Sequence, residues 1–189
     1  MELERIWKIA VLGSASVPEE SSPGGKAFEI GQSIALKKGV ILTGACPGLP
    51  HAAVLGASSA GGITVGISPA SNREEHISVY SYPVDSQIIL YTGMGPKARN
   101  VILVRSSDAC IFVGGGMGTL NEFTIAYDEL GPGCAVGVLL DSGGFSNEFS
   151  RLASLSDSRP VALLAVEFEP QALVDKMFDH ISRHQLSRY

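Results

Sequence analysis

Short apolar runs alternate with helical segments along almost the whole chain, and most of the runs end in a turn rich in glycine or serine. The expected strands cover 6–12, 40–43, 63–67, 88–91, 109–113, 135–140 and 161–166. The expected helices cover 26–38, the alanine-rich segment that ends near 61, 97–106, 119–130 and 170–183. Apolar runs of this kind are typical of strands buried on both faces of a parallel sheet. The alternation therefore predicts a single α/β domain over 1–189, with a Rossmann-like, doubly wound and mainly parallel sheet flanked by helices.

Two polar stretches interrupt this alternation. Residues 68–87 contain Pro69, Pro83 and several serines, which favours a loop that crosses the sheet edge or covers a site. Residues 141–158 form a second polar excursion between two expected strands. In a doubly wound sheet, ligands bind at the carboxyl ends of the strands, so the loops that follow the strands are expected to carry the function.

The composition narrows the classes of partner. A hydrophobic fraction of 45% with only 17% charged residues is typical of a compact α/β protein, and the scarcity of charge suggests a homodimer or a higher homo-oligomer. The net charge is −5 and no basic run occurs, so neither nucleic acid nor an anionic membrane is expected as a partner. The apolar runs are too short for a membrane span or a signal-peptide core.

The cysteines and histidines give no metal pattern. Cys46, Cys110 and Cys134 are widely spaced in apolar or glycine-rich surroundings, which argues against a disulfide framework and a thiolate metal cage and fits a reducing cytoplasm. His180 and His184 could share one face of the last expected helix, as metal ligands do. No third ligand accompanies them, so a solvated helix end is the preferred interpretation. We expect neither a metal nor a cofactor.

The run 114–122, Gly-Gly-Gly-Met-Gly-Thr-Leu-Asn-Glu, leaves an apolar strand and enters the helix expected from Thr119. Its glycines allow positive φ values and a close approach of the backbone to a ligand. The free N–H groups of a helix start favour an anion, of which phosphate is the natural example. An alternative is a capping box, in which Thr119 caps the helix and Glu122 reaches back to the Thr119 N–H. A cap does not require the glycines, so the run favours a ligand site, with Glu122 open to either role.

Arg99 and Glu122 are expected at the same edge of the sheet, although they are far apart in the sequence. The helix that begins near Arg99 is ~15 Å long, and the strand that follows runs back antiparallel to it over ~17 Å, so the chain returns to its starting level. Arginine offers a planar fork of donors for a phosphate, and glutamate can bind a sugar hydroxyl or act as a general acid or base. The alternative for Arg99 is a solvated helix end.

Four further residues, Ser14, Ser16, His51 and Asp108, have both a local and a ligand-binding interpretation. Ser14 and Ser16 follow the first expected strand and can donate to a phosphate, although serines in turns also bond their own backbone. His51 is expected near the same crevice, where an ordinary helix-start histidine is the preferred interpretation. For Asp108, which precedes the strand 109–113, we favour a structural role over a ligand contact.

The glycine run resembles the P-G-G-x-G-T-x-x-E motif of the Lonely Guy (LOG) family, whose members were once widely labelled lysine decarboxylases. The matching positions are Gly115, Gly116, Gly118, Thr119 and Glu122, with Gly114 in place of the proline. Residues 97–100 (Lys-Ala-Arg-Asn) and 107–109 (Ser-Asp-Ala) resemble the family's upstream arginine motif and the segment before its strand. Residues 12–14 and 43–48 occupy the places of its first two glycine loops, so the resemblance covers roughly residues 6–140.

The resemblance implies a Rossmann-like dimer that hydrolyses the N-glycosidic bond of nucleoside 5′-monophosphates to give the base and ribose 5-phosphate. Arg99 and Glu122 would be the catalytic pair, with Glu122 contacting the ribose or activating water. The implied ligand- and phosphate-binding residues are Gly13, Ser14, Gly44, Gly115, Gly116, Met117, Gly118 and Thr119. Lysine decarboxylation is not expected, because amino-acid decarboxylation usually needs a pyridoxal phosphate lysine or an equivalent electron sink.

Two parts of the LOG pattern are absent. The proline before the glycines is missing, and the family's M-H-x-R-K context appears as the segment 95–100, Gly-Pro-Lys-Ala-Arg-Asn, without the histidine or the lysine after the arginine. In these features the chain looks closer to the branch that includes the molybdenum cofactor carrier proteins, which bind a pterin phosphate without clear catalysis. The sequence thus leaves two alternatives for a phosphate ligand: a nucleoside monophosphate that is hydrolysed, or a pterin phosphate that is carried.

Overall fold

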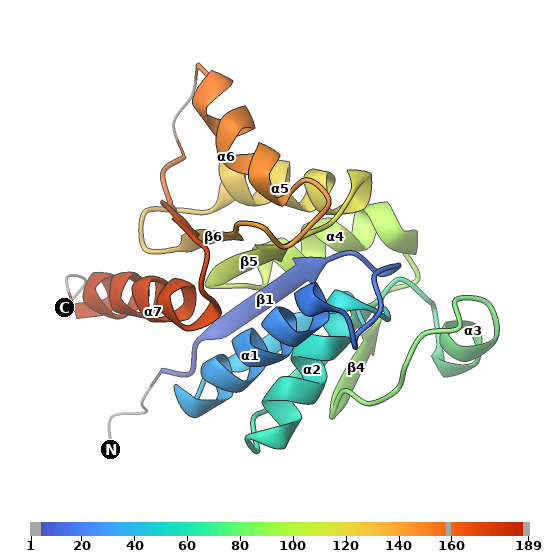
Figure 1. Cartoon of the computed structure of the whole chain (residues 1–189). Coiled ribbons are helices and arrows are strands. Elements are labelled where there is room, and N and C mark those ends of the chain that lie inside the picture. Colours follow the sequence, from blue (N-terminus) through green and yellow to red (C-terminus); the bar gives the residue numbers. More distant parts are fainter. Residues whose placement is uncertain (1–4, 158–159, 187–189) are drawn as a thin grey trace.

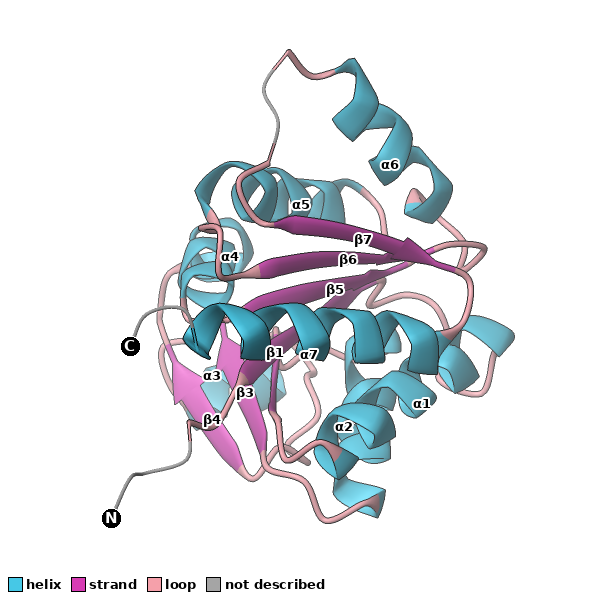
Figure 2. Cartoon of the chain, turned by 90° about the vertical axis from the view of Figure 1, so that its left-hand side faces the viewer, coloured by secondary structure: helices cyan, strands magenta, loops and turns pink. Residues whose placement is uncertain are grey.

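The computed structural model describes residues 5–157 and 160–186, which form an α/β structure of three layers (Figures 1 and 2). Within these residues lies a seven-stranded sheet with parallel pairings throughout, in the order β4-β3-β2-β1-β5-β6-β7. The strands are β1 (Lys8–Gly13), β2 (Val40–Thr43), β3 (Thr64–Ser68), β4 (Ile88–Tyr91), β5 (Ala109–Val113), β6 (Ala135–Leu139) and β7 (Leu163–Glu167). The helices are α1 (Ser22–Leu36), α2 (Leu49–Ser59), α3 (Arg73–Ser78), α4 (Gly95–Arg105), α5 (Met117–Glu129), α6 (Ser146–Leu155) and α7 (Pro170–Leu186). The predicted fold class is confirmed.

Each face of the sheet has its own core, because side chains along a strand alternate between the faces. In β1, Ile9 and Val11 pack toward α1, α2 and α7, whereas Ala10 and Leu12 pack toward α4, α5 and α6. Figure 2 shows α7 crossing the face that α1 and α2 also cover. The central strands are buried on both faces, which explains why they are continuously apolar in the sequence.

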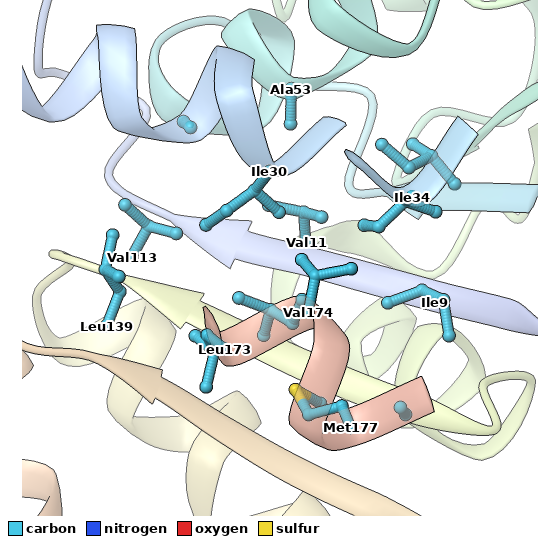
Figure 3. Packing of buried hydrophobic residues seen from close by; sticks show 14 of the residues in the cluster. Ile9, Val11, Ile30, Ile34, Ala53, Val113, Leu139, Leu173, Val174 and Met177 are labelled. Atoms are coloured by element: carbon cyan, nitrogen blue, oxygen red, sulfur yellow. The ribbon is translucent and has the colours of Figure 1, made fainter. Parts of the chain in front are cut away.

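The core under α1, α2 and α7 fixes the central strand. Figure 3 shows side chains from α1 and α7 gathered around Val11 of β1, among them Ile30 and Val174. All three side chains are fully buried. Burying an aliphatic side chain of this size contributes about 1.5–3 kcal/mol, so this packing holds β1, and the loop that follows it, in a defined position.

The chain reverses its direction of winding at β1. It proceeds from β1 through β2 and β3 to β4 on one side, and then returns to β5 on the other side of β1. The two strands end level with each other, because Gly13 pairs with Val113. The loops that follow β1 and β5 therefore diverge, and a crevice is expected outside the carboxyl ends of these strands.

Two helices lie in the polar stretches 68–87 and 141–158, where the sequence predicted none. Helix α3 forms because the Asn72 side chain accepts a hydrogen bond from the Glu75 N–H at 2.9 Å, but it is too short to show an apolar period. Helix α6 lies in the second polar excursion and buries Phe149 completely. The last residue of that excursion, Ser158, lies outside the described residues. The prediction of a loop over 68–87 was therefore wrong at α3, and α6 was missed.

Three helices begin earlier than the sequence predicted. Helix α1 begins at Ser22 because the Ser21 side chain accepts a hydrogen bond from the Gly24 N–H at 3.2 Å, so glycines that suggested a loop form its first turn. Helices α4 and α5 begin at Gly95 and Met117, in place of 97 and 119. Glycine in the first turn makes the start of a helix difficult to predict from the sequence, because the intrinsic helix propensity of glycine is low.

Candidate functional site

A hollow of about 270 Å³ lies at the carboxyl edge of the sheet, where the loops after β1 and β5 diverge. Its walls come from the loop after β1, the loop after β2, the segment between α3 and β4, and the first turns of α4 and α5. The sequence-predicted residues that line it are Gly13, Ser14, Arg99, Gly116, Gly118, Thr119 and Glu122. The structure thus brings the expected charged pair and two of the expected glycine loops to one place.

Three predicted ligand-binding residues lie outside this lining. Gly44 lies against the Arg99 side chain, because a Cβ at Gly44 would be 1.8 Å from Arg99 Nη1. Gly115 lies against Thr119 in the same way. The Met117 side chain is 69% exposed. The first two residues therefore support lining residues, whereas Met117 lies at the protein surface.

The turn between β5 and α5 requires glycine for two different reasons. Gly114 and Gly115 have φ angles of 58° and 100°, in the region that side chains rarely adopt. A Cβ on Gly115 would also lie 2.4 Å from Thr119 Oγ1. Gly116 is the N-cap of α5 and makes no side-chain capping bond. The first N–H groups of α5 have no intrahelical partner, and Gly116, Gly118 and Thr119 form part of the wall of the hollow.

Glu122 does not belong to a capping box. Helix α5 begins at Met117, so Thr119 is a first-turn residue rather than the N-cap, and the box that the sequence left open as an alternative is wrong. Glu122 is instead 8% exposed and lines the hollow. Its carboxyl group is therefore buried for a reason other than helix initiation.

Arg99 is buried in the first turn of α4, with 4% of its surface exposed. Within the described part of the chain, its Nε and Nη1 atoms are buried without any hydrogen-bond partner. An unpaired buried donor costs about 1–3 kcal/mol, and more when the group is charged. A cost of this size points to a partner that is not part of the chain, because Arg99 lines the hollow.

The pKa of Glu122 is raised to about 7, because burial disfavours the charged carboxylate more than the positive charges of Arg99 and Lys97 favour it. The Asn100 amide, turned so that its nitrogen meets acceptors, donates to Glu122 Oε1 at 3.0 Å and to the Pro96 carbonyl at 2.9 Å. Glu122 therefore exchanges its proton near neutral pH. A carboxyl group of this kind can act as a general acid or a general base.

The lining residues that were not predicted as site residues from the sequence are Ala15, Cys46, Tyr82, Pro96, Lys97 and Asn100. Cys46 follows the glycine of the loop after β2, and burial raises the pKa of its thiol to about 11, so the thiol stays protonated at neutral pH. Tyr82 comes from the polar stretch 68–87. The position of Cys46 in a glycine loop is a signal that could have suggested it, whereas nothing in the sequence singles out Tyr82.

Of the other candidate residues, His51 and Asp108 have partners within the chain. Ser16 lines the hollow, whereas His51 does not. The ring nitrogens of His51 lie 2.6 Å from Glu19 Oε1 and 3.1 Å from Asp85 Oδ2. Asp108 lies at the amino end of β5, away from the hollow, and accepts hydrogen bonds from Arg5 and from the Lys8 N–H. The structural role preferred for Asp108 is thereby confirmed.

No cluster of three or more His, Cys, Asp or Glu side chains in residues 5–157 and 160–186 is arranged to hold a metal ion. The rings of His180 and His184 contact each other with centroids 4.4 Å apart, and His180 Nε2 lies 3.0 Å from the Pro132 carbonyl oxygen. None of the helices, as far as they are described, combines the length and the apolar character that crossing a membrane requires.

The hollow is thus suited to an anion. Arg99 offers two unpaired nitrogen atoms, and the start of α5 offers backbone N–H groups and a favourable dipole. Lys97 adds a positive charge at the rim, and Ser14 adds a hydroxyl group. Beside these donors lies one carboxyl group that titrates near neutral pH. The arrangement can hold a phosphate group and present Glu122 to whatever the phosphate carries.

Known proteins share this fold and, in part, this sequence. A protein of Archaeoglobus fulgidus described only as uncharacterized is 38% identical over 125 residues, which are 66% of this chain and 76% of that protein. The structure of the molybdenum cofactor binding protein from Rippkaea orientalis has a TM-score of 0.72 and 29% identity, covering 93% of this chain and 97% of that one. The Moco carrier protein from Chlamydomonas reinhardtii has a TM-score of 0.72 and 26% identity, covering 95% and 99%.

A likeness of fold alone extends to DNA processing protein A from Helicobacter pylori, whose structure was determined for its single-stranded DNA binding. The TM-score is 0.60 and the identity 17%, over 92% of this chain and 80% of that one. A match to a protein family, rather than to a single protein, covers residues 6–173, which include the seven described strands and the whole hollow. That match is to the SLOG cluster4 family, and this chain belongs to it.

Proposed function

We propose that this protein binds a phosphate-bearing small molecule in the Arg99–Glu122 hollow. The observation that carries the proposal is Arg99 in the first turn of α4, whose Nε and Nη1 atoms are buried without a partner among the described residues. Arg99 lines the hollow together with the start of α5. A phosphate oxygen would satisfy both the guanidinium and the N–H groups of the helix start, and such charge-assisted bonds are the stronger kind. The hollow has room for a phosphate and an adjoining sugar or ring substituent, at the lower limit of the ~300–1,000 Å³ typical of ligand pockets.

We propose a pterin phosphate of the molybdenum cofactor type as the ligand, and carriage without turnover as the role. Two observations support this choice over the general class. The proteins from Rippkaea orientalis and Chlamydomonas reinhardtii, at 29% and 26% identity, are described as binding or carrying molybdenum cofactor. The chain also lacks the histidine and the second basic residue of the LOG arginine motif, as residues 95–100 show.

One observation favours a second candidate, hydrolysis of nucleoside 5′-monophosphates. Glu122 has a pKa of about 7 and lies beside Arg99, which suits proton transfer at neutral pH. In that reaction an ionised Glu122 takes a proton from the attacking water, whose oxygen bonds to C1′ of the ribose. The C1′–N bond breaks, its electron pair leaves with the base, and the base takes up a proton. The products are the free base and ribose 5-phosphate.

A binding and turnover panel tests both candidates. Isothermal titration calorimetry compares a phosphorylated pterin and AMP with the same pterin and adenosine without phosphate, which are the matched controls. Chromatography of the same mixtures measures free base. Tight binding of the phosphorylated pterin without turnover supports the carrier, whereas release of adenine from AMP supports the hydrolase. Equal affinity for the phosphorylated and unphosphorylated forms would contradict the phosphate site itself.

We further propose that the protein is a homo-oligomer and that its partners are small molecules rather than nucleic acid. Exposed apolar side chains support the first part: Ile88 and Leu90 of the edge strand β4 are 47% and 52% exposed, and Met94 is 51% exposed. The net charge of −5 supports the second part. Sedimentation velocity measures the first part, and titration with a fluorescent single-stranded oligonucleotide, at low salt, measures the second.

A further inference from the structure

The segment between α3 and β4, residues 79–87, forms one wall of the hollow and contributes no residue to any predicted motif. We call it the strap. Figure 1 shows how the chain leaves α3, at the margin of the molecule, and crosses back to β4 at the edge of the sheet. Tyr82 is the strap residue that lines the hollow. The neighbouring Tyr80 contacts the Tyr82 ring with centroids 5.4 Å apart, but it is not part of the lining.

A fully buried histidine fixes the position of the strap. His76 is 0% exposed, and its Nε2 lies 2.9 Å from the Pro83 carbonyl oxygen of the strap. Its Nδ1 lies 2.8 Å from Ser68 Oγ at the end of β3. The Pro83 carbonyl oxygen can only accept, so the proton of the neutral ring lies on Nε2 and Nδ1 accepts from the Ser68 hydroxyl. Nε2 then carries the proton and donates it to Pro83, which ties the strap to the sheet.

The same histidine also holds the tyrosine itself. The Tyr82 N–H donates to the His76 carbonyl oxygen at 3.1 Å. The two rings meet edge to face, with centroids 5.6 Å apart and an interplanar angle of 86°. Backbone and ring contacts therefore both connect Tyr82 to a residue that cannot move without breaking buried hydrogen bonds. Such support keeps a contacting side chain in place before a ligand arrives.

Tyr82 lines the hollow together with Cys46, Arg99 and Glu122. Burial is the largest influence and raises the pKa of Tyr82, so the hydroxyl remains a protonated donor at neutral pH. Tyr82 makes ring and backbone contacts with its neighbours in the described chain, but no hydrogen bond of its hydroxyl occurs among them.

We propose that Tyr82 is a ligand-binding residue, whose hydroxyl donates a hydrogen bond to an oxygen of the bound phosphate compound beside Arg99, and that His76 positions it. The inference rests on the proposed phosphate-ligand function and adds a third kind of donor to the guanidinium and the helix start. It also gives the strap a role, because the strap carries this donor across the edge of the sheet. The hollow then has donors from the strap as well as from α4 and α5, which selects ligands with several acceptor oxygens.

The test compares Tyr82→Phe with Tyr80→Phe. Both variants remove one phenolic oxygen from the strap and keep the ring, but only the first oxygen belongs to the lining of the hollow. Affinity is measured by calorimetry for AMP and for a phosphorylated pterin, with thermal unfolding as the check on folding. We expect Tyr82→Phe to weaken binding about tenfold and Tyr80→Phe to leave it within about twofold, since one hydrogen bond is at stake.

Unchanged affinity in Tyr82→Phe overturns the inference, and Arg99→Ala separates it from the wider proposal. If the wild-type protein binds and Arg99→Ala does not, while Tyr82→Phe equals wild type, only the role of Tyr82 fails. If the wild-type protein binds neither probe, the proposed function fails and the inference fails with it.

The positioning role of His76 has its own readout. We expect His76→Ala to weaken binding about as much as Tyr82→Phe, and the double variant to weaken it little further, because both changes remove the same contact. His76→Gln can still donate to Pro83 and accept from Ser68, so it is expected to recover part of the affinity. Additive losses in the double variant contradict the positioning role, even when unfolding temperatures fall.

Discussion

Two carboxyl groups are buried at opposite ends of the same sheet, Asp108 at the amino end of β5 and Glu122 beyond its carboxyl end. Asp108 has a full set of partners: Arg5 Nη2 at 2.6 Å, the Lys8 N–H at 2.9 Å and Lys8 Nζ at 3.5 Å. Glu122 has Asn100 as a donor and lies near Arg99, whose own Nε and Nη1 atoms have no partner in the described chain.

The difference separates a structural carboxylate from one that we propose to contact a ligand. The carboxylate oxygens of Asp108 accept hydrogen bonds from Arg5 and from the Lys8 N–H, so the group stabilises the starts of β1 and β5. Near Glu122, the Nε and Nη1 atoms of Arg99 are buried without a hydrogen-bond partner in the described chain. This lowers the stability of the protein, and a bound ligand would offset the loss. Burial alone does not distinguish the two, since Asp108 is 7% exposed and Glu122 is 8% exposed. The completeness of the hydrogen bonding does.

The largest expected effect comes from Arg99→Ala. Removing the guanidinium removes two unpaired donors from the hollow, and we expect affinity for a phosphate ligand to fall at least about 100-fold, as charge-assisted hydrogen bonds contribute about 1.5–3 kcal/mol each. Calorimetry with the best ligand of the panel measures it. Arg105→Ala is the matched control on the same helix, because Arg105 is exposed and paired with Glu129. A similar loss in both variants would argue against a specific site.

Glu122→Gln tests whether the buried carboxyl group titrates as described. The pKa of Glu122 in the folded protein, about 7, lies above its unfolded value of 4.5, so folding favours the protonated form. The stability that Glu122 contributes is therefore fully present below pH 4.5 and is lost as the pH rises through about 7. Relative to Glu122→Gln, we expect the wild-type free energy of unfolding to fall by about 3 kcal/mol across this range. Urea unfolding at several pH values measures it, and parallel curves would refute the shift.

Asp108→Ala is the opposite test, with an expected effect on stability alone. The change leaves the Lys8 N–H without its carboxylate acceptor and removes the ion pair with Arg5. We expect the free energy of unfolding to decrease by about 2 kcal/mol, mainly through the backbone donor, because Arg5 is partly exposed and can be solvated. Ligand affinity, measured under folding conditions, should stay within about twofold, since no step of binding uses this group. A large loss of affinity would contradict the distinction between a structural region around Asp108 and a ligand-binding region around Glu122.

The smallest expected effect comes from Gly44→Ala. The added methyl group would lie 1.8 Å from Arg99 Nη1, so the guanidinium must shift. We expect affinity to fall about tenfold, less than for Arg99→Ala, because the charge is retained but displaced. Gly25→Ala serves as the control, since a Cβ there meets no atom within 4 Å and Gly25 does not line the hollow. If Gly44→Ala binds as tightly as the control, the position of Arg99 is less constrained than the contact indicates.

Much of the fold could be predicted because apolar runs report burial directly. The strands 40–43, 88–91 and 109–113 have the predicted bounds. Helices α3 and α6 were missed, because one is held by a side-chain cap and the other lies in a polar excursion and buries Phe149. Short-range bonds and single buried residues produce helices without a periodic signal.

The site could be predicted in outline for a related reason. The alternation predicts that the strands run parallel, and parallel strands bring their carboxyl ends to one edge, so Arg99 and Glu122 could be expected at the same edge. The start of α5 could not be predicted, because Gly116 at its N-cap and Gly118 in its first turn have a low helix propensity. That error of two residues in the helix start is what made a capping box at Thr119 and Glu122 look possible.

By itself, the sequence determined the parallel sheet, the edge at which a ligand is expected and the glycines that allow a close approach, because these depend on local pattern and on chain direction. Only the tertiary structure decided that Arg99 Nε and Nη1 are buried without a partner in the described chain, that the pKa of Glu122 is raised to about 7, and that Tyr82 lines the hollow. Burial and unsatisfied hydrogen bonding are properties of the packed molecule, since each depends on side chains that the sequence places far apart.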